Sequence, residues 1–232
     1  MTLLFDLMTN GVLSVTGRLV DASNATLYGT VSHGDDEARV IYKPVAGERP
    51  LWDFPDGNLA QREYASFLIS EIGGWHLVPL TILRDGPFGI GMVQQWIDID
   101  ESVDLALFYR EDYASLREMA LFDAVVNNTD RKIGHLLPTA DGKLYGCDHG
   151  VTFHREDKLR TVLWQWSSQS LKVEEIRRLE DLKASLQSDK VVKELISDDE
   201  FNALNFRIDR LLSERVFPEP SDEWPAVPWP PF

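Results

Sequence analysis

The chain has 232 residues, of which 38 are acidic and 23 basic, so its formal net charge is −15. The acidic residues are spread over both halves of the sequence, which disfavours binding to nucleic-acid phosphates or to anionic lipid headgroups. The single cysteine, Cys147, excludes an intrachain disulfide, and no apolar run approaches the roughly 20 residues of a membrane span. We therefore expect a cytoplasmic protein with no nucleic-acid partner and no stable membrane association.

The first hundred residues are expected to form mainly strands and turns. Short apolar and β-branched segments occupy residues 6–20, and a polar turn then separates two further strand-like segments. Residues 58–72 place apolar side chains at helical spacing and end at Gly73-Gly74, which predicts one helix. The strands after residue 20 are expected at 26–31, 38–43, 81–83 and 91–97.

The second half is expected to be largely helical. Apolar spacing predicts an amphipathic helix and three later helices, at residues 113–127, 172–186, 191–196 and 200–215. Ser197 and Glu200 form a capping-box pattern before the last helix. The Pro- and Trp-rich end could dock back on the domain or bind a partner.

Two motifs carry the candidate chemistry. Residues 127–135 (NNTDRKIGH) place Asp130 beside Arg131 and Lys132, and Asp148-His149-Gly150 follows one short hairpin later. Phosphoryl transfer from ATP needs a group that positions the attacking oxygen, oxygen ligands for a metal, and cations against the developing charge. Either motif alone is also typical of a plain turn, whereas the pair after a helix favours a phosphate-transfer centre. Asp123 on that helix is expected to stabilise the loop.

These motifs resemble the catalytic loop and the Asp-x-Gly motif of phosphoinositide 3/4-kinase-like enzymes and of HipA-type bacterial kinases. The resemblance implies that Asp130 is the catalytic Asp, with Arg131 and Lys132 beside it, and that Asp148 binds metal. His135 stands where those families have a metal-binding Asn, and Lys132 replaces their usual His. The whole chain is also similar to small stand-alone actinobacterial kinase-like proteins, through the block YKPVAGERPLWDFP at residues 42–55.

The same resemblance implies an α+β, two-lobed protein-kinase-like fold. It has a β-rich N-terminal lobe with one helix (residues 1–95), a mainly helical C-terminal lobe (residues 96–217), and a tail (residues 218–232). The implied ATP-binding residues are a phosphate loop, a lysine with its glutamate partner, and two residues of the inter-lobe linker: Ser23, Asn24, Thr26, Lys43, Glu63, Gln94 and Gln95. From sequence alone, the phosphate loop is also typical of a polar turn, Lys43 and Glu63 of surface charges, and the linker residues of a buried strand.

His135 leaves the activity open, because magnesium prefers oxygen ligands and imidazole is a poor substitute for an Asn carbonyl. The cofactors implied are ATP with magnesium or manganese. A first hypothesis is a phosphotransferase that moves the γ-phosphate of ATP to a protein hydroxyl or a small polar acceptor. A second is a nucleotide-binding pseudokinase with a regulatory role. Transfer of AMP in place of phosphate is a third possibility that nothing in the sequence favours.

Overall fold

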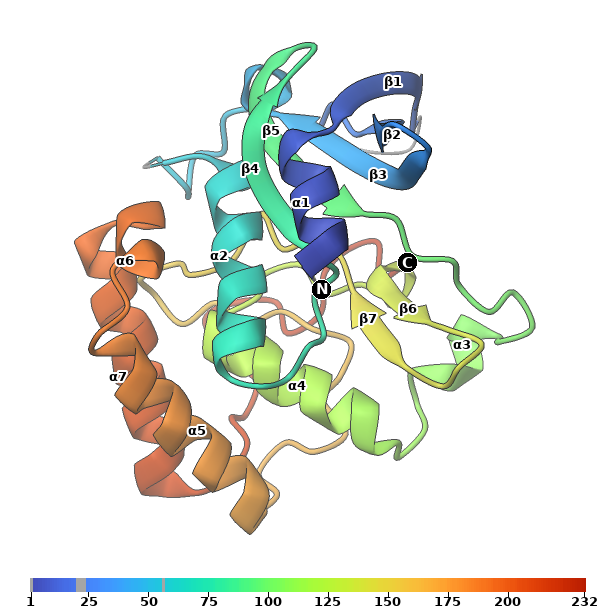
Figure 1. Ribbon diagram of the computed structural model, residues 1–232. Helices are drawn as coiled ribbons and strands as arrows, with labels where there is room; N and C mark the ends of the chain where they lie inside the picture. The colour runs from blue at the N-terminus through green and yellow to red at the C-terminus, as the bar shows by residue number, and fades with distance from the viewer. Residues whose placement is uncertain (1, 20–23, 56) are drawn as a thin grey trace.

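A computed structural model describes residues 2–19, 24–55 and 57–232, and it shows a twisted sheet above a helical region (Figure 1). The sheet is antiparallel and has the strand order β1-β2-β3-β5-β4. Its strands are β1 (Val12–Arg18), β2 (Leu27–His33), β3 (Asp36–Pro44), β4 (Thr81–Gly86) and β5 (Gly89–Gln95). The predicted α+β fold, with strands first and helices later, is confirmed.

The N-terminal end differs from the expectation. A helix, α1 (Thr2–Asn10), precedes β1, although strands were expected from Asp6 onward. The reason is visible in the apolar spacing: Leu4, Leu7 and Met8 lie three and four residues apart and therefore share one helix face. That face packs against the core, where Met8 is fully buried, and α1 contacts β2, β3 and β4.

Helix α2 (Leu59–Ile72) forms where the apolar spacing predicts it. Asn58 caps its start by accepting a hydrogen bond from the N–H of Gln61 at 2.8 Å, and Gly73 follows its last turn. The helix contacts β4 and β5 on one side and α4, α5 and α6 on the other, so it links the sheet to the helical region. Glu63, on this helix, is thereby buried between the two parts of the molecule.

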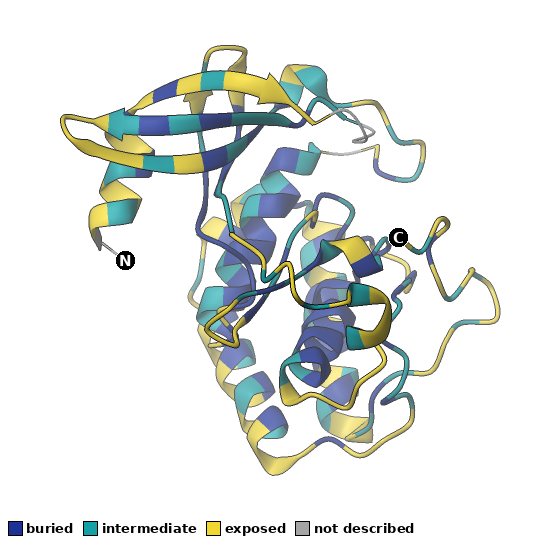
Figure 2. Cartoon of the chain, turned by 90° about the vertical axis from the view of Figure 1, so that its right-hand side faces the viewer, coloured by how far each residue is buried: buried dark blue, intermediate teal, exposed yellow. Residues whose placement is uncertain are grey.

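The helical region is built around α4, and buried residues gather at its centre in Figure 2. The helix is apolar on nearly every side and lies inside the helical region, which corrects the expected amphipathic pattern.

The short helix α3 was not predicted, whereas the capping box of α7 is present, with the Ser197 N–H donating to Glu200 at 2.9 Å. The elements of this region are α3 (Leu105–Phe108), α4 (Ala114–Val126), β6 (Leu136–Pro138), β7 (Leu144–Gly146), α5 (Val173–Leu186), α6 (Val191–Leu195) and α7 (Asp198–Glu214). None of the helices in the described ranges is both long and apolar enough to cross a bilayer.

A buried ion pair fixes the loop that follows α4. Asn127 ends the helix in the left-handed conformation, with φ of 52°, which Asn tolerates better than most residues. The chain then turns back so that Arg131 donates to Asp123 from Nε at 2.9 Å and from Nη2 at 2.8 Å. Both side chains have no exposed surface, and Nη1 of Arg131 also donates to the Cys147 carbonyl at 3.1 Å. The pair therefore ties residues 127–135 both to α4 and to the end of β7.

Removing one partner of this ion pair leaves an uncompensated buried charge. We expect Asp123→Ala to lower the free energy of unfolding by about 3–5 kcal/mol, as measured by urea denaturation. Glu118→Ala is the matched control, because Glu118 lies on the same helix and pairs with Arg178 at the surface at 3.3 Å. It should cost less than about 1 kcal/mol. Equal losses in the two variants would show that the buried pair does not anchor the loop.

Candidate functional site

A cleft of about 710 Å³ lies where the sheet meets the helical region. Its walls come from β3, the end of β5, the loop after α4 and the segment after β7. Most of the predicted site residues line it, namely Asn24, Thr26, Lys43, Gln94, Gln95, Asp130, Lys132, His135 and Asp148. The structure thus brings together residues that are more than 120 positions apart in the sequence.

Lys43 is the electrostatic centre of the cleft. Its Nζ lies 2.6 Å from Oε1 of Glu63 and 2.7 Å from Oδ1 of Asp148. The second oxygen of Glu63 accepts the backbone N–H of His149 at 2.9 Å, and the Glu63 side chain is only 1% exposed. Burial alone would lower the pKa of Lys43, but the carboxylates of Asp148 and Glu63 outweigh it and raise that pKa. Lys43 therefore stays protonated and joins β3, α2 and the Asp-His-Gly turn.

The backbone of Asp148 has a φ of 60°, in the left-handed region that residues other than Gly rarely adopt. The Lys43 ammonium lowers the pKa of Asp148, which keeps the carboxylate ionised. Its Oδ2 lies 3.5 Å from Nε2 of His135. Burial lowers the pKa of His135 to about 4, so the imidazole is neutral near pH 7. Nδ1 of His135 faces the N–H of Lys132 at 3.4 Å, which favours the tautomer with the proton on Nε2.

The donor set fits a metal that is shared with a ligand. Across residues 2–19, 24–55 and 57–232, no group of three or more His, Cys, Asp or Glu side chains is arranged to hold a metal ion. Magnesium is commonly held by one or two carboxylates together with phosphate oxygens of a nucleotide. Asp148 could supply one such carboxylate. His135 could bind through Nε2 only after its proton moves to Nδ1.

Asp130 also lines the cleft and is held by its neighbours. Lys132 Nζ lies 3.2 Å from Oδ2 of Asp130, and the Asp130 N–H donates to the side-chain oxygen of Asn128 at 3.0 Å. Asn128 in turn donates to Asp123 at 3.0 Å, so the position of Asp130 depends on the same carboxylate that binds Arg131. Burial raises the pKa of Asp130, which makes it a stronger base than an exposed carboxylate.

Arg131 does not lie where the sequence interpretation needs it. It was assigned a catalytic role, but its guanidinium is fully buried against Asp123 and does not line the cleft. Its Nη2 also contacts Nε2 of His149 at 2.6 Å, which links the loop to the Asp-His-Gly turn. We therefore reassign Arg131 as a positioning residue.

The nucleotide side of the cleft is only partly as expected. Ser23 lies outside the described residues, whereas Asn24 accepts the N–H of Arg49 at 2.9 Å and Thr26 is buried at the cleft wall. Gln94 donates its side-chain amide to Thr81 within the sheet at 2.9 Å. The backbone N–H groups of Gln95 and Trp96 donate to the carbonyls of Leu80 and Arg39. Gln94 and Gln95, which were assigned to the inter-lobe linker, therefore lie in β5 and are engaged in the sheet.

Several cleft residues had no sequence signal strong enough to identify them. Ile41, Ile97 and Ile99 form apolar lining beside the polar groups, and they read in sequence as ordinary strand residues. Phe232 also lines the cleft because the tail folds back over the helical region. The markers of the C-terminal end lie where the sheet meets the helical part in Figures 1 and 2. Contacts of this kind join distant segments, so local periodicity does not reveal them.

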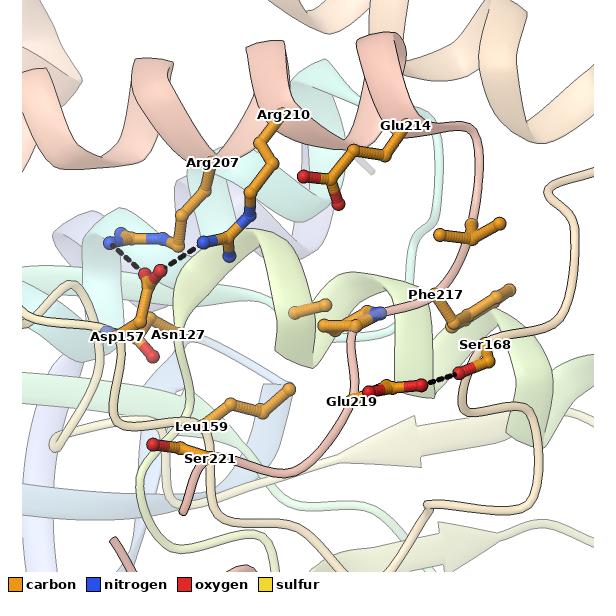
Figure 3. Close-up of a pocket in the computed structure, with 13 residues that line it drawn as sticks. Asn127, Asp157, Leu159, Ser168, Arg207, Arg210, Glu214, Phe217, Glu219 and Ser221 are labelled. Carbon is orange, nitrogen blue, oxygen red and sulfur yellow. Dashed lines mark hydrogen bonds and ion pairs between the residues drawn. The ribbon is translucent and has the colours of Figure 1, made fainter. Parts of the chain in front are cut away.

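A second hollow, of about 460 Å³, lies on another face, between α7 and residues 216–221 (Figure 3). Arg207 and Arg210 extend from α7 toward Asp157, with which both form ion pairs. Glu214 and Glu219 add further negative charge to its walls. None of the predicted site residues lines this hollow, and its charges largely compensate one another, so we assign it no chemistry.

The fold is shared with several solved kinases. A structure of the Golgi casein kinase with Mn/ADP bound superposes with a TM-score of 0.60, at 15% sequence identity, covering 92% of this chain and 74% of that chain. The structure of hydra Fam20 with sugar gives a TM-score of 0.59 at 13% identity, covering 90% and 86%. The Helicobacter pylori proinflammatory kinase CtkA gives 0.51 at 11% identity, covering 90% and 94%. At these identities the comparison shows a kinase-like fold and nothing further.

The sequence itself has a much nearer relative. No model of a known protein family matches the chain. Protein Rv2133c of Mycobacterium tuberculosis (strain ATCC 25618 / H37Rv) is 40% identical over an alignment of 262 residues, which covers 97% of this chain and 94% of that protein. Identity at this level over nearly the full length of both proteins shows common descent, and the chain belongs to the same family as Protein Rv2133c.

Proposed function

We propose that the protein is an ATP-dependent phosphotransferase of the phosphoinositide-kinase/HipA-like type, which moves the γ-phosphate of ATP to a protein hydroxyl or a small polar acceptor. The observation that carries the proposal is that Lys43 bonds both Glu63 and Asp148 inside a cleft that Asp130 also lines. The likeness to a kinase crystallised with Mn/ADP supports the same interpretation. In this proposal residues 1–95 form the nucleotide-binding lobe and residues 96–217 the catalytic lobe.

The nucleotide would bind with its base against the apolar lining from Ile41 and Ile97 and its phosphates toward Lys43. The ammonium of Lys43 would contact the α- and β-phosphates while Glu63 keeps the side chain extended into the cleft. The hydroxyl of Thr26 is placed at the same wall and can donate to a phosphate oxygen. Magnesium or manganese, held by Asp148 and His135 together with the phosphates, would neutralise phosphate charge.

Asp130 would act on the acceptor. Its carboxylate accepts the proton of the acceptor hydroxyl while the hydroxyl oxygen forms a bond to the γ-phosphorus and the bond to the β,γ-bridging oxygen breaks, which releases ADP. The raised pKa of Asp130 favours this proton transfer. Lys132, 3.2 Å from Asp130, offers a positive charge to the phosphoryl group in transit.

The alternative is a nucleotide-binding pseudokinase with a regulatory role. It is favoured by the environment of Asp148, whose carboxylate is bound by Lys43 and faces an imidazole where a metal-binding amide is usual in the families that the sequence resembles. Such a site would hold a nucleotide through Lys43 without efficient transfer. Activity and binding experiments separate the two functions.

Asp130→Asn tests transfer. Incubation with γ-labelled ATP and magnesium or manganese should give phosphate release or autophosphorylation that falls at least about 100-fold in Asp130→Asn, because the proton acceptor is lost. Asp141→Asn, which removes an exposed carboxylate paired with Lys143, should keep full activity. Equal rates in the wild-type protein and Asp130→Asn would exclude the phosphotransferase. ATP labelled on the α-phosphate should label no product, which separates phosphate transfer from AMP transfer.

Lys43→Met tests nucleotide binding without any need for turnover. ATP should raise the melting temperature of the wild-type protein and of Asp130→Asn, but not that of Lys43→Met, since the phosphate-binding charge is gone. Lys143→Met, in the exposed hairpin turn, is the control and should respond to ATP as the wild type does. If ATP stabilises none of the four proteins, with or without metal, both the kinase and the pseudokinase are ruled out.

A further inference from the structure

Residues 224–232 run along the helical region and end at Phe232, which lines the cleft. The Ala226 carbonyl accepts the backbone N–H of Thr161 at 3.0 Å and the indole N–H of Trp164 at 2.9 Å. Farther along, the Pro231 carbonyl accepts the N–H of Ile133, within the loop that carries Asp130, at 2.8 Å. The segment is therefore bonded both to the chain that follows the Asp-His-Gly turn and to the catalytic loop.

A cation–π cluster holds the start of this segment. The Nζ of Lys158 lies 4.1 Å from the ring centre of Trp224 and 5.3 Å from that of Trp52, which belongs to the loop before α2. Lys158 is itself buried, with its Nζ 3.3 Å from Glu156. Residues 224–232 are thus held at both ends.

The segment covers a backbone edge at Thr161, beside the stretch that contains Asp130. Thr161 pairs in parallel with Arg131 on one side, and its own N–H on the other side goes to Ala226. Extended peptides commonly bind such edges through main-chain hydrogen bonds. Since residues 224–232 already take that position, the acceptor must fit in the space that remains beside Asp130.

Arg160 lies next to the stretch that contains Asp130. Its N–H donates to the Asn128 carbonyl at 2.9 Å, and its carbonyl accepts the N–H of Arg131 at 3.0 Å, so its backbone is bonded to both ends of the short stretch that contains Asp130. The Arg160 charge acts on Asp130 and lowers its pKa, against the larger effect of burial. Within the described part of the chain, its guanidinium makes no hydrogen bond or ion pair, and its Nε is buried without a partner.

The unpartnered group of this half-exposed side chain is its Nε N–H. Withdrawing the Nε group from water without giving it a partner is unfavourable, and an anionic ligand would compensate that loss. Lys132 is a less suitable group for binding such an anion, because its ammonium already pairs with Asp130.

We infer that the acceptor is a small alcohol carrying a carboxylate or phosphate group, which Arg160 binds while the acceptor hydroxyl faces Asp130. The inference rests on the proposed phosphotransferase and narrows its acceptor from two classes to one. Residues 224–232 exclude an extended polypeptide, and Arg160 selects the charge. A polypeptide acceptor, or a contact of Arg160 with ATP, gives different results in the experiment below.

The full-length protein should be incubated with γ-labelled ATP and an actinobacterial extract divided by ultrafiltration into small molecules and macromolecules. We expect Asp130-dependent label in a small-molecule product that binds an anion exchanger, and none above the Asp130→Asn background in the macromolecular fraction. Transfer to the macromolecules, or to a neutral alcohol alone, would overturn the inference while leaving the phosphotransferase intact. Absence of any Asp130-dependent transfer would contradict the phosphotransferase itself, and the inference with it.

Arg160→Gln should raise KM for the labelled small molecule about tenfold or more and leave KM for ATP unchanged. Arg155→Gln, which removes an exposed arginine of the same segment, should change neither value. Arg160→Lys keeps the charge and should retain part of the affinity, which separates lost charge from lost folding. An effect of Arg160→Gln on KM for ATP alone would assign the residue to the nucleotide and overturn the inference.

Discussion

The buried pair of Arg131 and Asp123 is the constraint on which the rest of the site depends. Two opposite charges with no exposed surface are tolerated only where their geometry and remaining hydrogen bonds are well satisfied. Here they are, because Asp123 also accepts from Asn128 and Arg131 also donates to Cys147. The loop that carries Asp130 and the end of the β6–β7 hairpin are consequently positioned by one ion pair, between Asp123 on α4 and Arg131 in the loop.

A second set of charges defines the cleft itself. Lys43 lies between two carboxylates that come from different parts of the fold, Glu63 on α2 and Asp148 after β7. In a chain of net charge −15, a phosphate ligand requires such a local cation. The unusual backbone of Asp148 is held by this interaction and by the Glu63 contact to the adjacent N–H of His149. The sheet, α2 and the Asp-His-Gly turn therefore contribute jointly to one centre.

The C-terminal tail, residues 218–232, docks against the helical region. It bonds to Thr161, Trp164 and Ile133, so it belongs to the wall of the site and does not project from the domain. The sequence left open whether this segment docks back or binds a partner, and the structure shows it docked. The last residue of the tail, Phe232, lines the same cleft as Asp130.

Much of the fold could be predicted from sequence because the signals are local. Helix α2 follows from apolar spacing between Asn58 and Gly73, and the α7 cap follows from Ser197 and Glu200 three residues apart. Helix α1 was missed because its apolar residues cover little more than two turns, which is too short a stretch for helical spacing to be distinguished from a strand. The fully buried position of α4 likewise depends on the helices and loops that surround it.

In the candidate site, too, some features could be predicted from local sequence and others depend on tertiary contacts. The sequence by itself indicated which groups to consider, since Asp130, Lys43 and Asp148 stand in motifs whose residue types suit phosphate transfer. Only the tertiary structure decided that Arg131 turns inward to Asp123, that Arg160 lies beside the loop of Asp130, and that the tail docks against that loop. The physical reason is that a side chain's partner is chosen by proximity and burial, and both arise when segments distant in sequence pack together.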